Sequence, residues 1–199
     1  LVLDSEVVDE LSDKIKKSAI ITDESCFYAE SGGQVGDKGI ISTENAEFKV
    51  TDTRKTPQGI FIHFGNVISG NFKIGNEVKL KIDSSLRELI KKNHSATHLL
   101  HAALRNNLGL HVAQRGSLVN ENKLRFDFSH NKQISSKQID TIQKEVTNII
   151  SNTCETQIDI KSQEEAIKLG AMALFGEKYG EEVRVVTLGE HNNKPYSIE

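Results

Sequence analysis

Apolar segments of only four or five residues recur through the first 80 or so residues, and turn-forming residues separate them. Glycine, asparagine, aspartate and Pro57 stand between these segments, which is typical of short strands joined by tight turns. Helices usually need longer periodic runs than these. The pattern therefore predicts five strands in a small barrel or sandwich, at residues 19–22, 39–42, 48–52, 60–64 and 78–82.

Helical periodicity begins after this region. Asp83 or Ser84 can cap a helix that runs to about Leu108, where Gly109 can end it. The alternation of apolar and charged residues at 124–128 predicts a half-buried strand.

The last third of the chain alternates helices and strands. Ser135 or Ser136 can cap a second helix, and the capping box at 162–165 opens a short third one. Strands are expected at 156–160 and 183–188. The apolar face expected of the second helix consists of Ile139, Ile142, Val146 and Ile149.

Together these patterns predict an α+β fold in two parts. We expect a small N-terminal β-barrel subdomain at 1–84. A second α+β domain follows at 85–199, with helices packed on an antiparallel sheet.

Composition narrows the class of protein. No apolar run approaches the roughly 18–20 residues that a membrane span needs, and two cysteines are too few for a disulfide scaffold. We therefore expect a cytoplasmic protein with no membrane partner and no DNA partner. The net charge is −3, yet residues 85–130 carry a net charge of +4, a local positive field that can meet a polyanion.

Three histidines lie within eight residues of the first helix. At about 100° per residue, His94, Thr97, His98 and His101 share one third of its circumference. We expect the opposite side to be buried and the histidine face to meet a cleft or solvent. Histidines at i and i+4 can offer two imidazoles to one metal, although a solvated polar face is an equal alternative. A zincin-type protease is excluded, because Ser95 stands where its glutamate must be.

A glycine-rich segment spans residues 27–39. It is no P-loop, since no Gly-Lys-Ser/Thr follows at the required distance. One interpretation is a tight β-turn in which glycines supply positive φ. The other is a loop whose backbone approaches a bound ligand.

Four segments together resemble the editing region of alanyl-tRNA synthetases. Residues 27–39 look like that family's glycine-rich motif, and residues 93–101 match its His-x-x-x-His motif. Residues 112–130 and 170–180 extend the similarity over nearly the whole chain.

The resemblance implies an RNA-dependent hydrolase inside an enzyme that ligates alanine to its tRNA. Such a module removes serine, and also glycine, from mischarged tRNA for alanine. The family holds zinc through two helix histidines, here His94 and His98, plus a Cys and a His of a Cys-Gly-Gly-Thr-His motif. That motif is expected just beyond Glu199, so the zinc site is incomplete in this chain.

The remaining site residues follow from the same resemblance and from the charge pattern. Thr97 and Gln114 match the family's editing residues. A synthetic site rejects one added hydroxyl only about 10²-fold, whereas a site built to hydrogen-bond that hydroxyl discriminates far better. His101 is expected to be structural or to support the ligands. Contacts to the aminoacyl-tRNA are expected from Arg115, Lys92, Glu30, Gly32 and Gly33.

Three alternatives stay open. The chain begins at Leu1 and its only methionine is Met172, which favours a segment of a longer synthetase. A free-standing editing protein of the AlaX type would perform the same chemistry. A module that docks tRNA and hydrolyses nothing is the third possibility, because half of the metal site is missing.

Overall fold

The computed structural model describes residues 1–199 except 4–5, 13–16, 153–155, 172–181, 192–193 and 199. The chain forms two compact units. The first unit comprises Leu1–Lys91 and Leu118–Lys123, and the second comprises Lys92–Ser117 and Leu124–Glu199. Our predicted boundary at 84/85 thus lies within the first unit.

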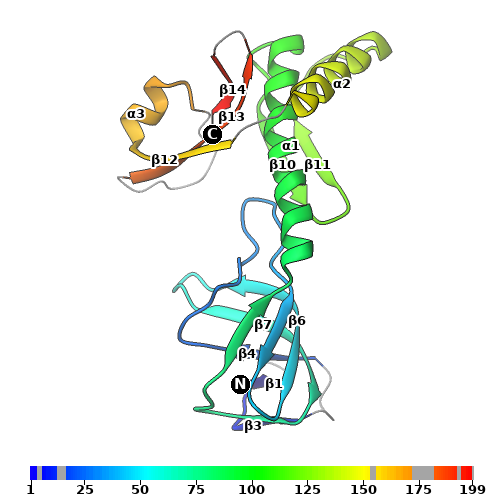
Figure 1. Ribbon diagram of the computed structural model, residues 1–199. Coiled ribbons are helices and arrows are strands. Elements are labelled where there is room, and N and C mark those ends of the chain that lie inside the picture. The colour runs from blue at the N-terminus through cyan, green and yellow to red at the C-terminus, as the bar shows by residue number, and fades with distance from the viewer. Residues whose placement is uncertain (4–5, 13–16, 153–155, 172–181, 192–193, 199) are drawn as a thin grey trace. The chain divides into compact units, whose positions relative to one another are not determined.

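The first unit is built on a seven-stranded antiparallel sheet in the order β2-β1-β4-β7-β6-β5-β9 (Figure 1). Two further strands, β3 and β8, pair with each other. All five predicted strands are confirmed. The shortest strands were not predicted, because two or three residues carry no periodicity. The bounds are β1 Val2–Leu3, β2 Glu6–Val7, β3 Glu10–Ser12, β4 Ser18–Ile21, β5 Gly39–Ser42, β6 Glu47–Lys55, β7 Phe61–Ser69, β8 Asn71–Lys73 and β9 Lys79–Ile82.

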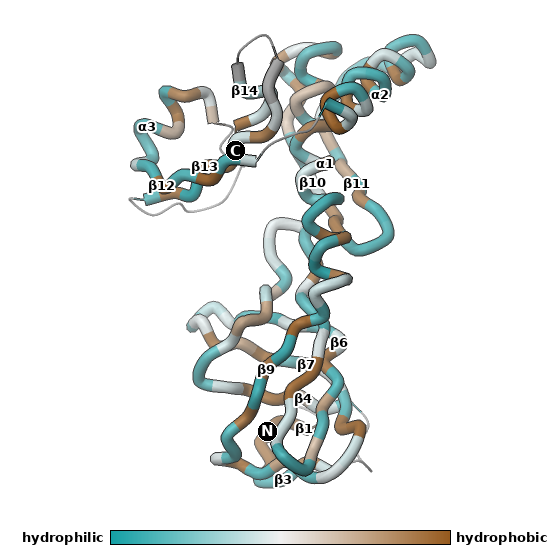
Figure 2. The backbone as a smooth tube through the Cα atoms, viewed as in Figure 1, coloured by the Kyte–Doolittle hydropathy of each residue, from teal (hydrophilic) through white to brown (hydrophobic). Residues whose placement is uncertain are grey.

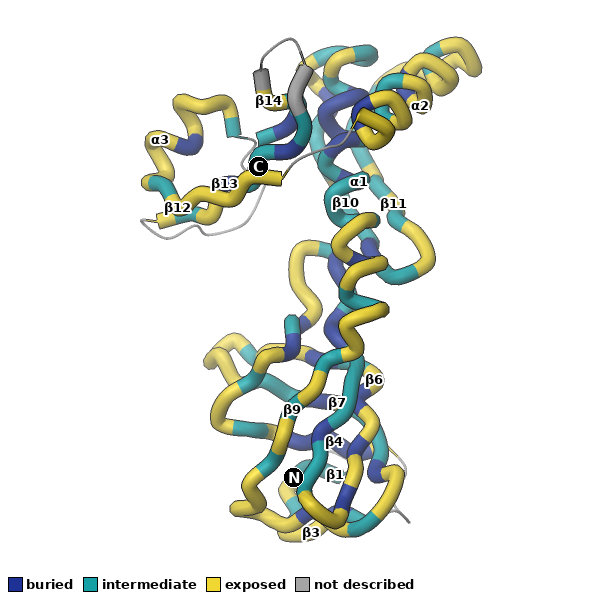
Figure 3. Tube along the Cα trace, in the orientation of Figure 1, coloured by how far each residue is buried: buried dark blue, intermediate teal, exposed yellow. Residues whose placement is uncertain are grey.

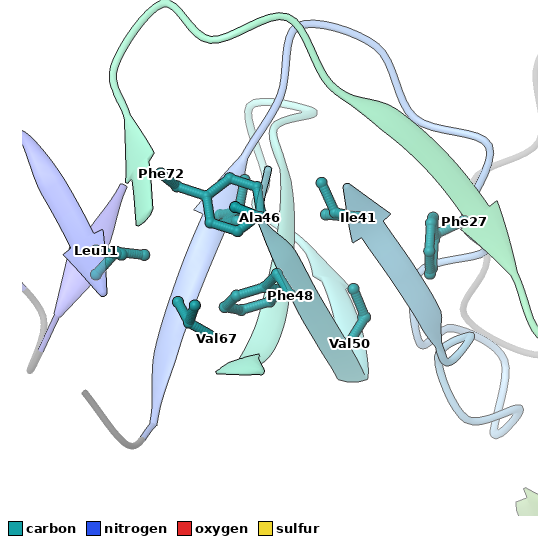
Figure 4. Close-up of a cluster of buried hydrophobic side chains, with 9 residues drawn as sticks. Leu11, Phe27, Ile41, Ala46, Phe48, Val50, Val67 and Phe72 are labelled. Atoms are coloured by element: carbon teal, nitrogen blue, oxygen red, sulfur yellow. The ribbon is translucent and has the colours of Figure 1, made fainter. Parts of the chain in front are cut away.

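The barrel is not confirmed. The edge strands β2 and β9 do not pair with each other among the described residues, so the sheet is open there. Alternate residues of its strands point into one apolar core, shown in Figure 4. Phe48 and Phe72 meet edge to face in this core, with ring centroids 6.2 Å apart. Ile41 and Leu11 are fully buried beside them.

The second unit combines helices with two small sheets. Strands β12, β13 and β14 form an antiparallel sheet, and β10 pairs with β11. Leu99, Ile149 and Leu188 join the long helix, the second helix and β13 in one buried cluster, which confirms helices packed on a sheet. The bounds are α1 Ser84–Leu108, β10 Gln114–Val119, β11 Leu124–Phe128, α2 Ser136–Ser151, β12 Thr156–Ser162, α3 Gln163–Lys168, β13 Glu182–His191 and β14 Lys194–Ile198.

The predicted helix caps are confirmed. Ser135 caps α2 in a capping box with Gln138, and Ser162 caps α3 in a capping box with Glu165. The Glu165 carboxylate accepts hydrogen bonds from the Ser162 backbone and hydroxyl, which lowers its pKa. The predicted apolar face of α2 is wrong at one end, because Ile139 is 52% exposed.

A polar cluster ties the end of α1 to α2 and β14. Tyr196 donates a hydrogen bond of 2.6 Å to Glu145 Oε1, and Asn107 Nδ2 donates one of 2.6 Å to Glu145 Oε2. Burial and the Glu145 carboxylate together raise the pKa of Tyr196. In Figures 2 and 3, α2 carries apolar residues among hydrophilic ones, and is mostly exposed with a few buried residues. No helix among the described residues has the length and apolarity to cross a membrane.

Candidate functional site

The histidine helix begins and ends where its capping residues predict. Asp83 Oδ1 accepts a hydrogen bond of 3.1 Å from the Leu86 backbone N–H at the start of α1. Gly109 follows the last residue, with φ of 114° that favours glycine. The helix is therefore continuous through the whole histidine motif.

His94 and His98 lie side by side on one face of α1. Their ring centroids are 4.8 Å apart and the ring planes are tilted by 39°. Both side chains are half-buried. This is the arrangement that i, i+4 spacing predicts for two imidazoles on successive turns.

The prediction that the whole histidine face lies outside the core is wrong. Thr97 and His101 are both only 5% exposed. The Thr97 hydroxyl donates a 2.8 Å hydrogen bond to the Asn93 carbonyl, and the His101 ring packs against Phe126 with centroids 5.0 Å apart. Helical spacing assigns a direction to each side chain, but it cannot say how far neighbouring elements reach around the helix.

The opposite side of α1 is apolar, as predicted, and partly covered. Leu99 and Ala103 are buried, while Ala96 and Leu100 are half-buried. Leu100 packs against the cluster that contains Ala103 and Val112. Packing on this side fixes the rotation of α1, and so fixes where the imidazoles point.

The other predicted residues of the second unit lie near this helix in sequence. Gln114 is the first residue of β10 and is half-buried, so its amide can meet both protein and ligand. Arg115 and Lys92 are exposed. Neither makes an ion pair within the part of the chain that the structure describes.

Two imidazoles on one helix face could serve as two of the four ligands of a tetrahedral zinc site. His94 and His98 fit two of the four positions, since imidazole nitrogens on one helix face are ordinary zinc ligands. No cluster of three or more histidine, cysteine or acidic side chains occurs among the described residues. Cys26 is exposed in the first unit, and Cys154 lies outside the described residues.

The glycine-rich segment forms the tight turn that was one of its two interpretations. Ser31 and Gln34 exchange backbone hydrogen bonds of 3.2 and 2.9 Å across Gly32 and Gly33. These glycines have φ of 57° and 83°, close to the values of a type I′ turn. The exposed Glu30 carboxylate lies 3.7 Å from Arg54 Nε, so a surface ion pair accounts for its position.

A buried ion pair supports this turn, and sequence reasoning missed it. The Arg87 guanidinium binds the Asp37 carboxylate through two nitrogens, one of them Nε at 2.8 Å. Asp37 also accepts a 2.6 Å hydrogen bond from the Tyr28 backbone N–H, and its side chain is 3% exposed. The hydrogen bond to Asp37 raises the pKa of Arg87. Fifty residues separate the two partners, so no local pattern could reveal the pair.

Backbone contacts also draw a distant segment onto the turn. Val119 donates a 2.8 Å hydrogen bond to the Gly33 carbonyl and accepts one of 3.0 Å from Val35. Lys38 pairs with Glu121 at 2.8 Å, which lowers the pKa of that carboxyl. The turn glycines are thus engaged by the protein's own chain.

Two more histidine arrangements were not predicted. His63 is fully buried, with Nδ1 3.0 Å from the Ile20 carbonyl and Nε2 2.8 Å from the Ser25 hydroxyl. Burial lowers the pKa of His63. His111 and His130 meet ring to ring in the second unit.

Comparison with known proteins shows what this sequence is similar to. Residues 1–86 match the family described as tRNA synthetases class II (A). Along its whole length the chain is 47% identical to the alanine–tRNA ligase of Mesorhizobium japonicum and 47% identical to that of Parvibaculum lavamentivorans. In sequence, the chain corresponds to a segment of alanine–tRNA ligases.

The relationship covers only part of each relative. The alanine–tRNA ligase of Rhizobium johnstonii is 46% identical over the same length. The chain spans 23% of each of these three alanine–tRNA ligases.

Proposed function

We propose that this chain is the proofreading segment of an alanine–tRNA ligase. It hydrolyses tRNA for alanine that has been mischarged with serine or glycine. The observation that carries the proposal is the imidazole pair of His94 and His98; His94 lies about one helical turn before Thr97, and His98 directly follows it. Similarity along the full chain to alanine–tRNA ligases supports tRNA as the partner.

In this proposal the histidine pair holds a zinc ion together with ligands from outside the described residues. Bound zinc supplies Lewis-acid or positioning chemistry. Other residues of the chain bind the substrate without contacting the zinc ion. Lys92 and Arg115 attract the phosphates, because both are exposed and lack an ion-pair partner among the described residues.

Thr97 and Gln114 are proposed to select the amino acid. The Thr97 hydroxyl hydrogen is already donated to Asn93, so its oxygen can only accept a hydrogen bond from the serine hydroxyl. The Gln114 amide offers both a donor and an acceptor. An alanyl group would leave these polar atoms without a partner, which disfavours its hydrolysis.

The test compares two conservative variants in a chain extended beyond Glu199. Thr97→Val removes the accepting oxygen at constant shape, and Thr97→Ser keeps it. Loss of one such hydrogen bond costs about 0.5–1.5 kcal/mol, so Thr97→Val should lower the preference for seryl- over alanyl-tRNA about 2- to 12-fold. Thr97→Ser should retain the preference. Equal preferences in both variants would show that Thr97 does not select the amino acid.

Thr97→Phe would be a poorer test of this role. Because Thr97 is 5% exposed, a phenyl ring there would disturb packing as well as any substrate pocket. Lost hydrolysis in that variant would not separate the two causes.

A second candidate function is tRNA docking without hydrolysis. It is favoured by the absence of a third metal ligand among the described residues. Seryl-tRNA hydrolysis by this chain, compared with the extended chain, separates the two functions. Zinc-dependent hydrolysis by the extended chain supports proofreading, and binding without hydrolysis in both chains supports docking.

A further inference from the structure

A second pair of histidines lies outside the face described above. His111 follows the end of α1, and His130 follows the end of β11. His111 Nε2 lies 2.9 Å from His130 Nδ1. The rings are stacked with centroids 5.1 Å apart and planes inclined by 21°. His111 is exposed and His130 half-buried, so solvent reaches the pair.

Hydrogen bonds made by Ser129 hold together the two backbone segments that carry these histidines. Ser129 N–H donates to the Ala113 carbonyl at 3.0 Å, and the Ala113 N–H donates to Ser129 Oγ at 3.1 Å. The Ser129 hydroxyl also reaches the His111 carbonyl at 3.1 Å. These bonds bring the backbones that carry the two imidazoles together.

Two further contacts fix the position of His111. Val112, the next residue, is fully buried, and its carbonyl accepts a hydrogen bond of 3.3 Å from Arg105 Nη1. A Cβ added to Gly109 would lie 3.0 Å from His111 Nδ1, so the ring rests against this glycine. Nε2 is thereby directed to His130. Such a supported arrangement is what a ligand site requires.

The nitrogen separation matches that of two neighbouring ligands on a metal ion. With metal–nitrogen bonds of about 2.0–2.1 Å, nitrogens about 2.9 Å apart subtend an angle of about 90°. That is the angle in square-planar and octahedral geometry, which Cu²⁺ and Ni²⁺ prefer. A tetrahedral ion would need the nitrogens roughly 0.4 Å further apart.

We propose that His111 and His130 form a two-histidine site for a divalent transition-metal ion of the Cu²⁺ or Ni²⁺ type. His111 Nε2 and His130 Nδ1 are the ligands, and water fills the other positions, since the described residues place no third histidine, cysteine or acidic donor there. Metal binding requires a lone pair on each of these two nitrogens, so each neutral ring carries its hydrogen on its other nitrogen. The metal ties the end of α1 to the end of β11 and braces the start of β10.

The test titrates Cu²⁺ into the 199-residue chain carrying His94→Gln and His98→Gln, in a buffer that does not bind metals. These substitutions remove the other imidazole pair, so the result is independent of the proposed proofreading function. Calorimetry should show one Cu²⁺ per chain, bound more tightly than Zn²⁺. Electron paramagnetic resonance should show two nitrogen ligands.

Added substitutions locate the site. His111→Gln and His130→Gln should each weaken Cu²⁺ binding at least tenfold and remove one nitrogen from the spectrum. Ser129→Ala keeps both ligands but loosens their support, and should weaken binding about 10- to 100-fold. Asn131→Gln, next to His130 but outside the pair, should leave binding unchanged.

Circular dichroism without metal verifies that each variant is folded. Unchanged Cu²⁺ affinity in both His111→Gln and His130→Gln would overturn the proposal. A spectrum with fewer than two nitrogen ligands in the parent chain would also overturn it.

Discussion

The two units differ in the partners that several of their polar side chains meet. In the first unit, buried polar groups meet complementary partners: Asp37 binds Arg87 and the Tyr28 N–H, and His63 has a partner at each ring nitrogen. In the second unit, imidazoles meet other imidazoles, in the pairs His94–His98 and His111–His130.

This difference separates structural polar groups from candidate ligand groups. Removing either partner of a buried carboxylate–guanidinium pair leaves the other charge buried without compensation, which destabilises the fold. Two imidazoles side by side do not neutralise each other, and both can bind the same third species. We therefore expect substitutions in the first unit to cost stability, and substitutions of the imidazole pairs to cost binding or activity.

The largest expected loss of stability follows Asp37→Ala. It leaves the Arg87 guanidinium, whose side chain is only 27% exposed, without its carboxylate, and the Tyr28 N–H without an acceptor. Breaking one side of a buried pair costs about 3–5 kcal/mol, which urea unfolding measures. The control is Lys91→Ala, whose pair with Glu88 is 60% exposed on both sides and should contribute less than about 1 kcal/mol. Equal losses in the two variants would remove the distinction between the units.

A smaller loss of stability is expected at His63 as the pH falls. Because burial lowers its pKa, the folded state favours neutral His63, and the unfolded state takes up a proton first. The ordinary pKa of histidine, about 6.5, applies to the unfolded state. The stability that His63 contributes is fully present above this pH and is lost as the pH falls from 6.5 through the lower pKa of the folded state. The slope for one proton is at most about 1.4 kcal/mol per pH unit.

The measurement for His63 is the free energy of unfolding between pH 5 and 7.5, in the parent chain and in His63→Gln. Subtracting the variant isolates His63 from the other histidines. Glu121, whose pKa is lowered from 4.5, loses its contribution only at more acidic pH. Parallel curves for parent and variant would show that His63 has the same pKa in both states.

The smallest effect on stability is expected at the histidine pair of α1. His94→Gln and His98→Gln replace half-buried imidazoles by polar amides of similar reach. Each should change the free energy of unfolding by less than about 1 kcal/mol. A loss comparable with that of Asp37→Ala would mean that the pair is structural, as the ion pair of the first unit is.

Local signals in the sequence predicted much of the fold. The caps Asp83, Ser135 and Ser162, and the turn at Gly32 and Gly33, depend on neighbouring residues and were found at the expected places. The side-by-side placement of His94 and His98 also follows from helix spacing alone.

Features that depend on tertiary contacts could not be predicted in this way. The Asp37–Arg87 pair and the burial of His63 join residues far apart in the chain. Burial of Thr97 depends on what covers the helix, which periodicity does not report. The meeting of His111 with His130 requires the ends of two elements to be adjacent, and no spacing rule signals that.

Proofreading by the imidazole pair is tested most directly in a full-length alanine–tRNA ligase that contains this chain. His94→Gln and His98→Gln, separately and together, are assayed for hydrolysis of seryl-tRNA and for ligation of alanine. We expect seryl-tRNA hydrolysis to collapse in each variant while alanine ligation and thermal stability stay at the parent level. Seryl-tRNA hydrolysis at the unmodified rate in the double variant would contradict the proposal.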